Sequence, residues 1–298
     1  MLPVILAAAM VYAFQGSARP SPFNADRAFA DLTKMVGFGP RPAGSAAIAK
    51  TRYYIVAELK KAGLQPELDE FQGMTPRGPR RMVNIRASRP GPRPTSIALV
   101  GHYDTKVFDN FSFVGANDGG SSAAWLLEMA RATSSLKLQN TLEFVFFDGE
   151  EAVVEWTSTD SLYGSRHDVD RRLNAGTLRQ LKALVLVEMI GDKNLNIRRE
   201  AESTDWLKMI IWNTAGSLGY NREFPTDSMA VTDDHVPYLR AAIPAVDLID
   251  FEYGPGGSPG PYWHSAADTL DKTSGKSLKI VGDVVYASLP EIDRRVSQ

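Results

Sequence analysis

The sequence predicts a single α/β domain whose mostly parallel central sheet is covered by helices on both faces. Segments 96–101, 142–147 and 183–190 are almost wholly apolar, which is typical of strands buried on both faces of a sheet. Amphipathic segments with helical spacing alternate with these strands, as a parallel sheet requires. No internal repeat, low-complexity tract or linker divides the 298 residues, so we expect one domain from residue 20 to residue 298.

The first two elements of the domain are predicted to be helices. Asn24 is a suitable N-cap for a first helix over 24–35, and Gly37 ends it. A second helix is expected over 47–62, and its predicted buried side consists of Ile48, Tyr53, Ile55, Val56 and Leu59. Two strands, 67–72 and 82–88, follow this helix.

The buried strands begin in the middle of the chain. The strand at 96–101 leads through a glycine-rich turn at 115–120 into a helix over 121–132. The strand at 142–147 ends at a turn signal, and we expect a loop from there to His167. The remaining expected elements are strands at 183–190 and 243–249 and helices at 206–218 and 277–293.

Composition limits the classes of partner and of site. Hydrophobic residues make up 44% of the chain, charged residues 23%, and the net charge is −2, which is ordinary for a soluble globular protein. This balance indicates no nucleic-acid partner and no anionic membrane surface, and nothing in it demands a second chain, so we expect a monomer. The absence of cysteine excludes disulfides, thiolate nucleophiles and cysteine-ligated zinc. Any metal site must use Asp, Glu and the four histidines.

The first residues resemble a targeting segment. Residues 2–14 are apolar and uncharged, too few for a comfortable membrane span but suited to a secretory signal. The usual basic start and an A-x-A cleavage site are missing, so a misplaced start codon, a retained anchor and a buried N-terminal helix stay open as alternatives. We expect residues 1–19 to be a signal peptide or N-terminal anchor, and the protein to be secreted or periplasmic.

Acidic and imidazole side chains collect where the predicted strands end. Glu150 and Glu151 follow the strand at 142–147, and two adjacent carboxylates there repel each other unless a cation relieves them. Glu188 interrupts an apolar strand, where a carboxylate is costly unless it is paired, ligated or protonated. Ligands of such sheets bind beyond the carboxyl ends of the strands. The other residues at this edge are His102, Asp104, Asp118 and His264.

Oxygen and imidazole donors of this kind suit a divalent metal such as zinc. Each residue by itself has an ordinary explanation, because an Asp in a glycine turn commonly stabilises the turn and a strand-end histidine is commonly just hydrogen-bonded. Together, they favour a metal site assembled from strand ends.

The motifs that carry these residues resemble the zinc aminopeptidase-like metallopeptidase family and, within it, the glutaminyl-peptide cyclotransferases. The general family pattern is GHYDT at 101–105, GANDGG at 115–120, FFDGEE at 146–151 and WH at 263–264. The narrower resemblance is FDGEEAVVEWTSTDSLYGSRH at 147–167, supported by DDHVPYLR at 233–240 and PYWH at 261–264. With FGPRPAGS at 38–45, the resemblance extends from about residue 24 to the end.

This resemblance implies an enzyme that converts the N-terminal glutamine of peptides or proteins to pyroglutamate and releases ammonia. It implies Asp118, Glu151 and His264 as ligands of one zinc ion, and Glu150 as the acid/base. Asp233 would be a hydrogen-bond partner near the reacting centre, beside Glu188. Trp156 and Trp263 would wall the substrate pocket.

Three departures from the animal cyclases are visible. Glu188 stands where they carry Asp, Asp247 stands where they carry His, and their cysteine pair is missing, which suits a bacterial type.

Two other functions remain open from the sequence. In a zinc aminopeptidase, His102, Asp118 and Glu188 would complete a second metal site, and Glu150 would activate water for hydrolysis of the N-terminal residue. A non-enzymatic binding domain on the same fold is the third option, but the chain retains Glu150 and every expected ligand.

Overall fold

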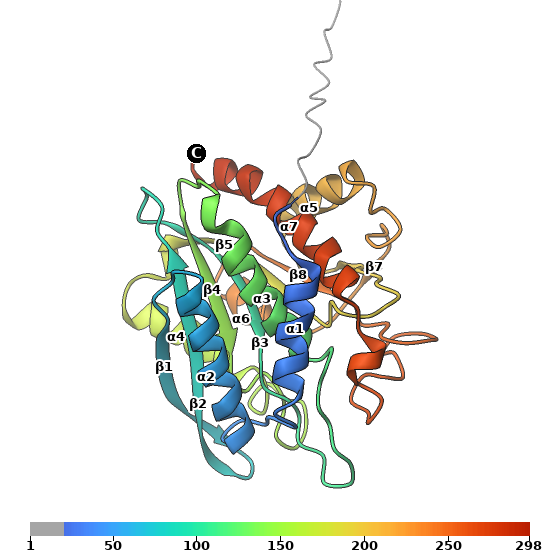
Figure 1. The fold of residues 1–298 in the computed structure, drawn as a ribbon. Helices are drawn as coiled ribbons and strands as arrows, with labels where there is room; N and C mark the ends of the chain where they lie inside the picture. Colours follow the sequence, from blue (N-terminus) through green and yellow to red (C-terminus); the bar gives the residue numbers. More distant parts are fainter. Residues whose placement is uncertain (1–20) are drawn as a thin grey trace, which may run out of the picture.

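The computed structural model describes residues 21–298, which form a central six-stranded sheet in the order β1-β2-β4-β3-β5-β8 (Figure 1). Four neighbouring strands, β4, β3, β5 and β8, are parallel to one another. At one edge of the sheet, β2 pairs antiparallel with both β4 and β1. The predicted α/β class with a mostly parallel sheet is therefore confirmed. The strands are β1 (Glu67–Thr75), β2 (Gly78–Arg89), β3 (Ser96–His102), β4 (Thr141–Phe147), β5 (Leu181–Glu188) and β8 (Ala245–Ile249).

Helices cover both faces of this sheet. One layer consists of α1 (Ala25–Val36), α2 (Ala46–Lys61), α3 (Gly120–Ala132), α5 (Asp205–Ser217) and α7 (Gly275–Val296). The opposite face carries α4 (Tyr163–Asn174) and α6 (Val236–Arg240). The N-cap predicted at Asn24 is confirmed, since its side chain accepts a hydrogen bond from the Arg27 amide. The small elements are β6 (Arg199–Glu200), β7 (Ser228–Met229), and 3₁₀ turns at Thr133–Ser135, Leu178–Gln180 and Leu270–Lys272.

Alternate side chains of the parallel strands enter two separate cores. In β4, Phe144 and Phe146 pack with the larger helical layer, whereas Val145 and Phe147 pack toward α4 and α6. All four are buried, so the strand is covered on both faces, as its apolar sequence predicted. Continuous apolar runs therefore mark the centre of the sheet, and the first polar residues after them mark its carboxyl edge.

Two sequence-based expectations about helices are wrong. The loop expected from the end of β4 to His167 ends earlier, at Leu162, because α4 begins at Tyr163; the buried charged residues of this helix form ion pairs instead of an apolar stripe. Arg172 contacts both Asp168 and Glu143 in this way. Tyr53 is 76% exposed rather than buried. It precedes the buried Ile55 by two positions, about 200° around the helix.

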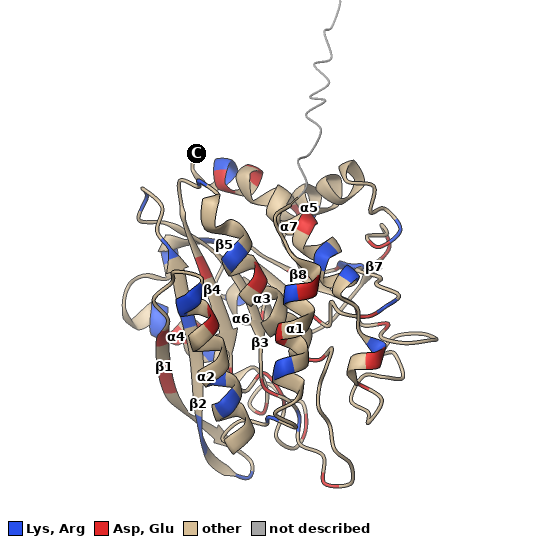
Figure 2. Ribbon diagram, in the orientation of Figure 1, with Lys and Arg blue, Asp and Glu red and all other residues tan. Residues whose placement is uncertain are grey.

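Charges of both signs are interspersed along the ribbon, in keeping with the net charge of −2 (Figure 2). Within residues 21–298, no helix combines the length and apolar character needed to cross a bilayer. The expected signal peptide or anchor at 1–19 lies outside the described residues, so it stays a prediction, as do secretion and the monomeric state.

Candidate active site

The eight side chains that we assigned to the site from the sequence all line one cavity of about 590 Å³. His102 ends β3, Glu188 ends β5, and Glu150 and Glu151 directly follow β4. The carboxyl ends of three neighbouring parallel strands therefore place acids and an imidazole at one edge. The eight are Asp118, Glu150, Glu151, Trp156, Glu188, Asp233, Trp263 and His264.

Asp118, Glu151 and His264 offer three ligand atoms that lie within 4.8 Å of one another. The Nε2 atom of His264 is 3.4 Å from Oδ2 of Asp118 and 3.3 Å from Oε1 of Glu151. Atoms that bind a tetrahedral zinc ion at its usual bond lengths lie about 3.3 Å apart. Asp118 Oδ2 and Glu151 Oε2 are buried and accept no hydrogen bond. Their geometry and unsatisfied oxygens fit a metal ion.

The electrostatics of this trio also suit a cation. Burial raises the pKa of Glu151 to about 7, and burial together with the Glu151 charge raises the pKa of Asp118. Burial lowers the pKa of His264 to about 4, which leaves a neutral imidazole, the form that binds metals. Two crowded carboxylates and a neutral imidazole form a site in which a divalent ion would relieve the repulsion.

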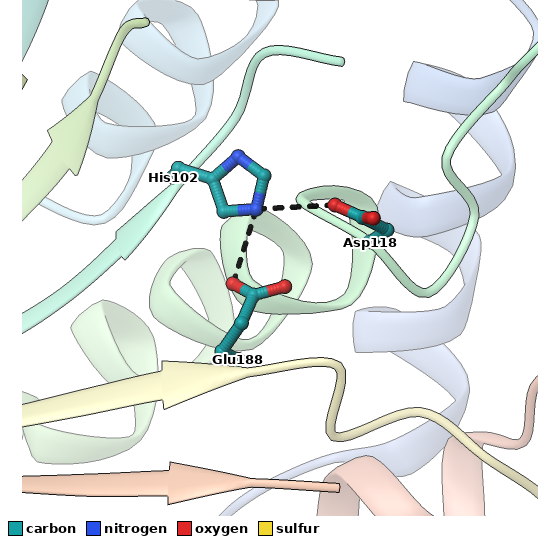
Figure 3. A group of neighbouring side chains, drawn as sticks. All are labelled: His102, Asp118 and Glu188. Carbon is teal, nitrogen blue, oxygen red and sulfur yellow. Dashed lines mark ion pairs between the residues drawn. The ribbon is translucent and has the colours of Figure 1, made fainter. Parts of the chain in front are cut away.

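A second His/Asp/Glu group shares Asp118 with the first. His102 lies between Asp118 and Glu188, and its Nε2 atom is 3.4 Å from Asp118 Oδ1 and 3.1 Å from Glu188 Oε2 (Figure 3). Glu188 also accepts a hydrogen bond from the Ser122 hydroxyl at 2.9 Å. In the described part of the chain, neither His102 nor Glu188 leaves a buried side-chain nitrogen or oxygen without a partner.

His102 itself supplies positive charge to this second group. Burial opposes its protonation, but the carboxylates of Glu188 and Glu150 hold its pKa well above the usual range. The imidazole lies within ion-pair distance of both carboxylates of this second group.

Two backbone positions allow this close packing. Gly119 has φ +71, and a Cβ there would lie 2.5 Å from the Asp104 carbonyl oxygen and 2.8 Å from the His102 ring. His264 also has a left-handed φ, +50, which is uncommon for a residue with a side chain. Such conformations cluster at functional sites, where the surrounding structure maintains them.

Two residues that support the site, Arg41 and Asp268, were missed from the sequence, and a third, Asp104, was named only as one of the strand-end residues. The fully buried Arg41 donates hydrogen bonds to the carbonyls of Tyr103 and Gly115, at 2.8 and 2.7 Å, and so fixes the turn before Asp118. Asp268 accepts from the Asp118 amide at 3.1 Å. The Asp104 carboxylate accepts from the backbone amides of Glu150 and Glu151. Because Arg41 and Asp268 bind backbone groups distant in sequence, no local pattern announces their role.

Glu150 and Asp233 face the cavity beside the trio. Burial, with the Glu151 and Asp233 charges, raises the pKa of Glu150 well above its usual range, although His102 opposes this. Burial and then the Glu188 charge raise the pKa of Asp233 to about 7. Asp233 is therefore poised to exchange a proton near neutral pH, and Glu150 holds a proton more tightly than an ordinary carboxyl group does.

Two tryptophans, Trp156 and Trp263, line the cavity. Trp263 stacks on His264 with ring centroids 3.9 Å apart and planes 18° apart, and Phe251 packs against its edge. Trp156 is 38% exposed, a high value for a large aromatic side chain.

Asp247 is buried in β8 behind the cavity and does not line it, and its carboxylate lies 3.6 Å from Nδ1 of His235. The Asp at position 247, where the animal cyclases carry His, therefore lies outside the lining of the cavity that contains the trio.

Residues 84–289 match the model of peptidase family M28, which is the class that this fold and site define. The mouse glutaminyl-peptide cyclotransferase-like protein is 31% identical over 77% of this chain, which spans 66% of that relative's length. A solved Acidobacteriales bacterium glutaminyl cyclase is 39% identical, with a TM-score of 0.88, over 93% of this chain and 97% of its own.

A Zn-dependent exopeptidase from Parabacteroides distasonis is 27% identical, with a TM-score of 0.81, over 92% of this chain and 99% of its own. The chain belongs to peptidase family M28 and, within that family, to the glutaminyl-peptide cyclotransferases. The resemblance inferred from the motifs is thereby confirmed.

Proposed function

We propose that this protein is a zinc-dependent glutaminyl-peptide cyclotransferase, which converts the N-terminal glutamine of peptides or proteins to pyroglutamate and releases ammonia. The observation that supports this most strongly is the close trio of Asp118, Glu151 and His264 beside the uncoordinated Glu150. Membership of the cyclotransferase family is the second support.

We infer that the trio holds one zinc ion. When bound, the ion would act as a Lewis acid on the side-chain amide carbonyl of the substrate glutamine. The second group is less suited to an ion, because His102 and Glu188 already satisfy each other. One ion per chain is therefore the arrangement that the contacts favour.

Glu150 is the residue that moves the proton. The α-amino nitrogen of the substrate attacks the side-chain amide carbon, a new C–N bond closes the five-membered lactam, and the bond to the amide nitrogen breaks. Glu150 accepts a proton from the attacking nitrogen and delivers it to the departing nitrogen, which leaves as ammonia. Because the attack is intramolecular, holding the glutamine folded contributes on the order of several kcal/mol to lowering the barrier.

The cavity walls bind and orient the substrate. Acidic side chains around the cavity, including Asp233, attract the N-terminal amine. Trp156 and Trp263 provide flat apolar walls that exclude water from the reacting atoms. No water nucleophile takes part in cyclisation, so a dry pocket favours it over hydrolysis.

An aminopeptidase is the second candidate, because His102, Asp118 and Glu188 form a second group able to hold a metal. Glu150 would then activate water. The contacts speak against this reading, because in the described residues His102 and Glu188 leave no buried side-chain nitrogen or oxygen without a partner, whereas Asp118 and Glu151 each do.

Incubation with Gln-initiated and Leu-initiated peptides tests the proposal, with products identified by mass spectrometry. A cyclotransferase gives products of unchanged residue count that have lost one ammonia, from the Gln-initiated peptides only. Release of a free N-terminal residue from either peptide would instead establish the aminopeptidase.

A further inference from the structure

A second cavity, of about 520 Å³, adjoins the active-site cavity and shares Trp156 and Thr232 with it. Beyond these two residues it continues over the start of α4 and the end of α6. A peptide whose first residue occupies the active-site cavity has to leave it through an opening. The exposed Trp156 stands at the boundary, so the second cavity is a path for the residues that follow.

The two cavities differ in the sign of their charge. Six carboxylates line the active-site cavity, and among the described residues Lys106 is the one lysine or arginine there. The six carboxylates are those of Asp118, Glu150, Glu151, Glu155, Glu188 and Asp233. Two arginines, Arg166 and Arg240, line the second cavity, against one carboxylate, Asp170. Positive charge therefore predominates only on the outer side of Trp156.

Neither arginine is neutralised by a carboxylate within residues 21–298. The Arg166 guanidinium donates to the carbonyls of Ser161 and Thr159, at 2.8 and 3.3 Å, and lies over the Tyr163 ring. These contacts fix the direction of the guanidinium but leave its charge uncompensated. Arg240 is exposed at the last position of α6 and forms no ion pair in the same part of the chain.

We propose that this second cavity is a subsite for substrate residues two to four, and that it selects acidic side chains there. The inference rests on the proposed function, because it needs the N-terminal glutamine in the first cavity. A guanidinium presents several donors in a planar fork that matches a carboxylate. The acidic inner cavity and the basic outer cavity would together orient a peptide with a free amine at its start and a carboxylate shortly after it.

A peptide series measures this preference. Gln-initiated peptides with Glu, Gln or Lys at position 2, 3 or 4 are compared by kcat/KM for ammonia release. We expect one Glu position to exceed its Gln counterpart by about threefold at low salt, the scale of an exposed ion pair, and the advantage to shrink as salt rises.

Two variants at Arg240 test whether this residue causes the preference for Glu-containing peptides. Arg240→Gln should bring the Glu-to-Gln ratio of kcat/KM close to one, and Arg240→Glu should make the Lys peptide the better substrate. Arg179→Gln is the matched control, since Arg179 is also exposed and unpaired in the described chain but precedes the amino end of β5. It should keep the wild-type ratio.

Cyclisation of every peptide at equal kcat/KM by the wild-type protein would overturn the subsite, and so would a Glu preference that both Arg240 variants retain. Either result leaves the cyclotransferase activity intact. No ammonia loss from any peptide would overturn the proposed function itself, and the subsite with it.

Discussion

The Nε2 atom of His102 lies 3.1 Å from Oε2 of Glu188, in a buried pair that occupies one of the two groups able to hold a metal. This pair distinguishes the two groups, because the other one retains two buried carboxylate oxygens without a hydrogen bond. The difference leads directly to a prediction about metal content.

We predict that the purified protein binds one zinc ion with high affinity. A single ion satisfies the unpaired oxygens of Asp118 and Glu151, whereas a second would have to displace the contact between His102 and Glu188. Metal analysis after exhaustive dialysis should give a ratio near one per chain. A reproducible ratio of two, with activity that depends on both ions, would contradict the single-ion account.

Replacement of His264 should remove most of the bound zinc. His264→Ala takes away the only nitrogen ligand of the trio, so both zinc content and ammonia release should fall. His167→Ala is the control, because His167 contacts Asp69 and stacks on Phe71, away from the cavity. Equal zinc content in the two variants would show that the trio is not the metal site.

Asp268 should affect the metal site without contacting the ion. Its carboxylate accepts from the amides of Asn117 and Asp118, at 2.7 and 3.1 Å, and so orients the turn that carries a ligand. Asp268→Asn should weaken zinc affinity or activity by about 10- to 100-fold, the range seen for supporting residues of metal sites. Competition with a chromogenic chelator measures the affinity. Wild-type affinity and activity in this variant would mean that the turn holds its geometry by itself.

A methyl group at position 119 should destabilise the fold and the site together. Gly119→Ala forces an alanine into a left-handed φ and toward the Asp104 carbonyl oxygen, so we expect the free energy of unfolding to fall by about 1–3 kcal/mol. Denaturant titration gives this value. Gly257→Ala is the matched control, because a Cβ there meets no atom within 4 Å. Similar losses in both variants would contradict the close-approach explanation.

The stability of the metal-free protein should fall as pH rises toward neutrality. Burial raises the pKa values of Glu151 and Asp233 to about 7, above the ordinary values of 4.5 and 3.8. Between those limits each of these two groups binds more protons in the native state than in the unfolded chain, so their contribution to the free energy of unfolding decreases with rising pH and levels off above about 7.

Zinc should reverse this trend, because it binds the ionised carboxylates and competes with their protons. Thermal unfolding of the chelator-treated and zinc-loaded proteins between pH 5 and pH 8 measures both effects, and the window brackets the pKa values of about 7. The shift in Tm that zinc produces should grow with pH. A shift that shrinks with pH would contradict the assignment of the raised pKa values.

Much of the fold could be predicted because buried parallel strands have a strong pattern. The run around Phe144 to Phe147 places side chains in both cores, and only a strand covered on both faces needs that. Helix α4 escaped prediction because its buried residues include Asp168 and Arg172, which are stabilised by pairing rather than by an apolar stripe.

In the candidate site, too, some residues could be predicted from the sequence and others could not. Glu150, Glu151 and Glu188 could be identified because carboxylates at the ends of apolar strands are unusual in themselves. The roles of Arg41 and Asp268 could not, because each is defined by backbone groups that only the folded chain brings near. The second cavity depends on the relative placement of α4 and α6, which no motif encodes.

The central claim is that Glu150 moves the proton beside a metal that other residues hold. Glu150→Gln tests it most directly, when zinc content and kcat for ammonia release from a Gln-initiated peptide are measured on the same preparation. We predict wild-type zinc content and a kcat lower by about 10²- to 10⁴-fold, the usual contribution of a general acid/base. Near-normal turnover, or loss of zinc from this variant, would contradict the account.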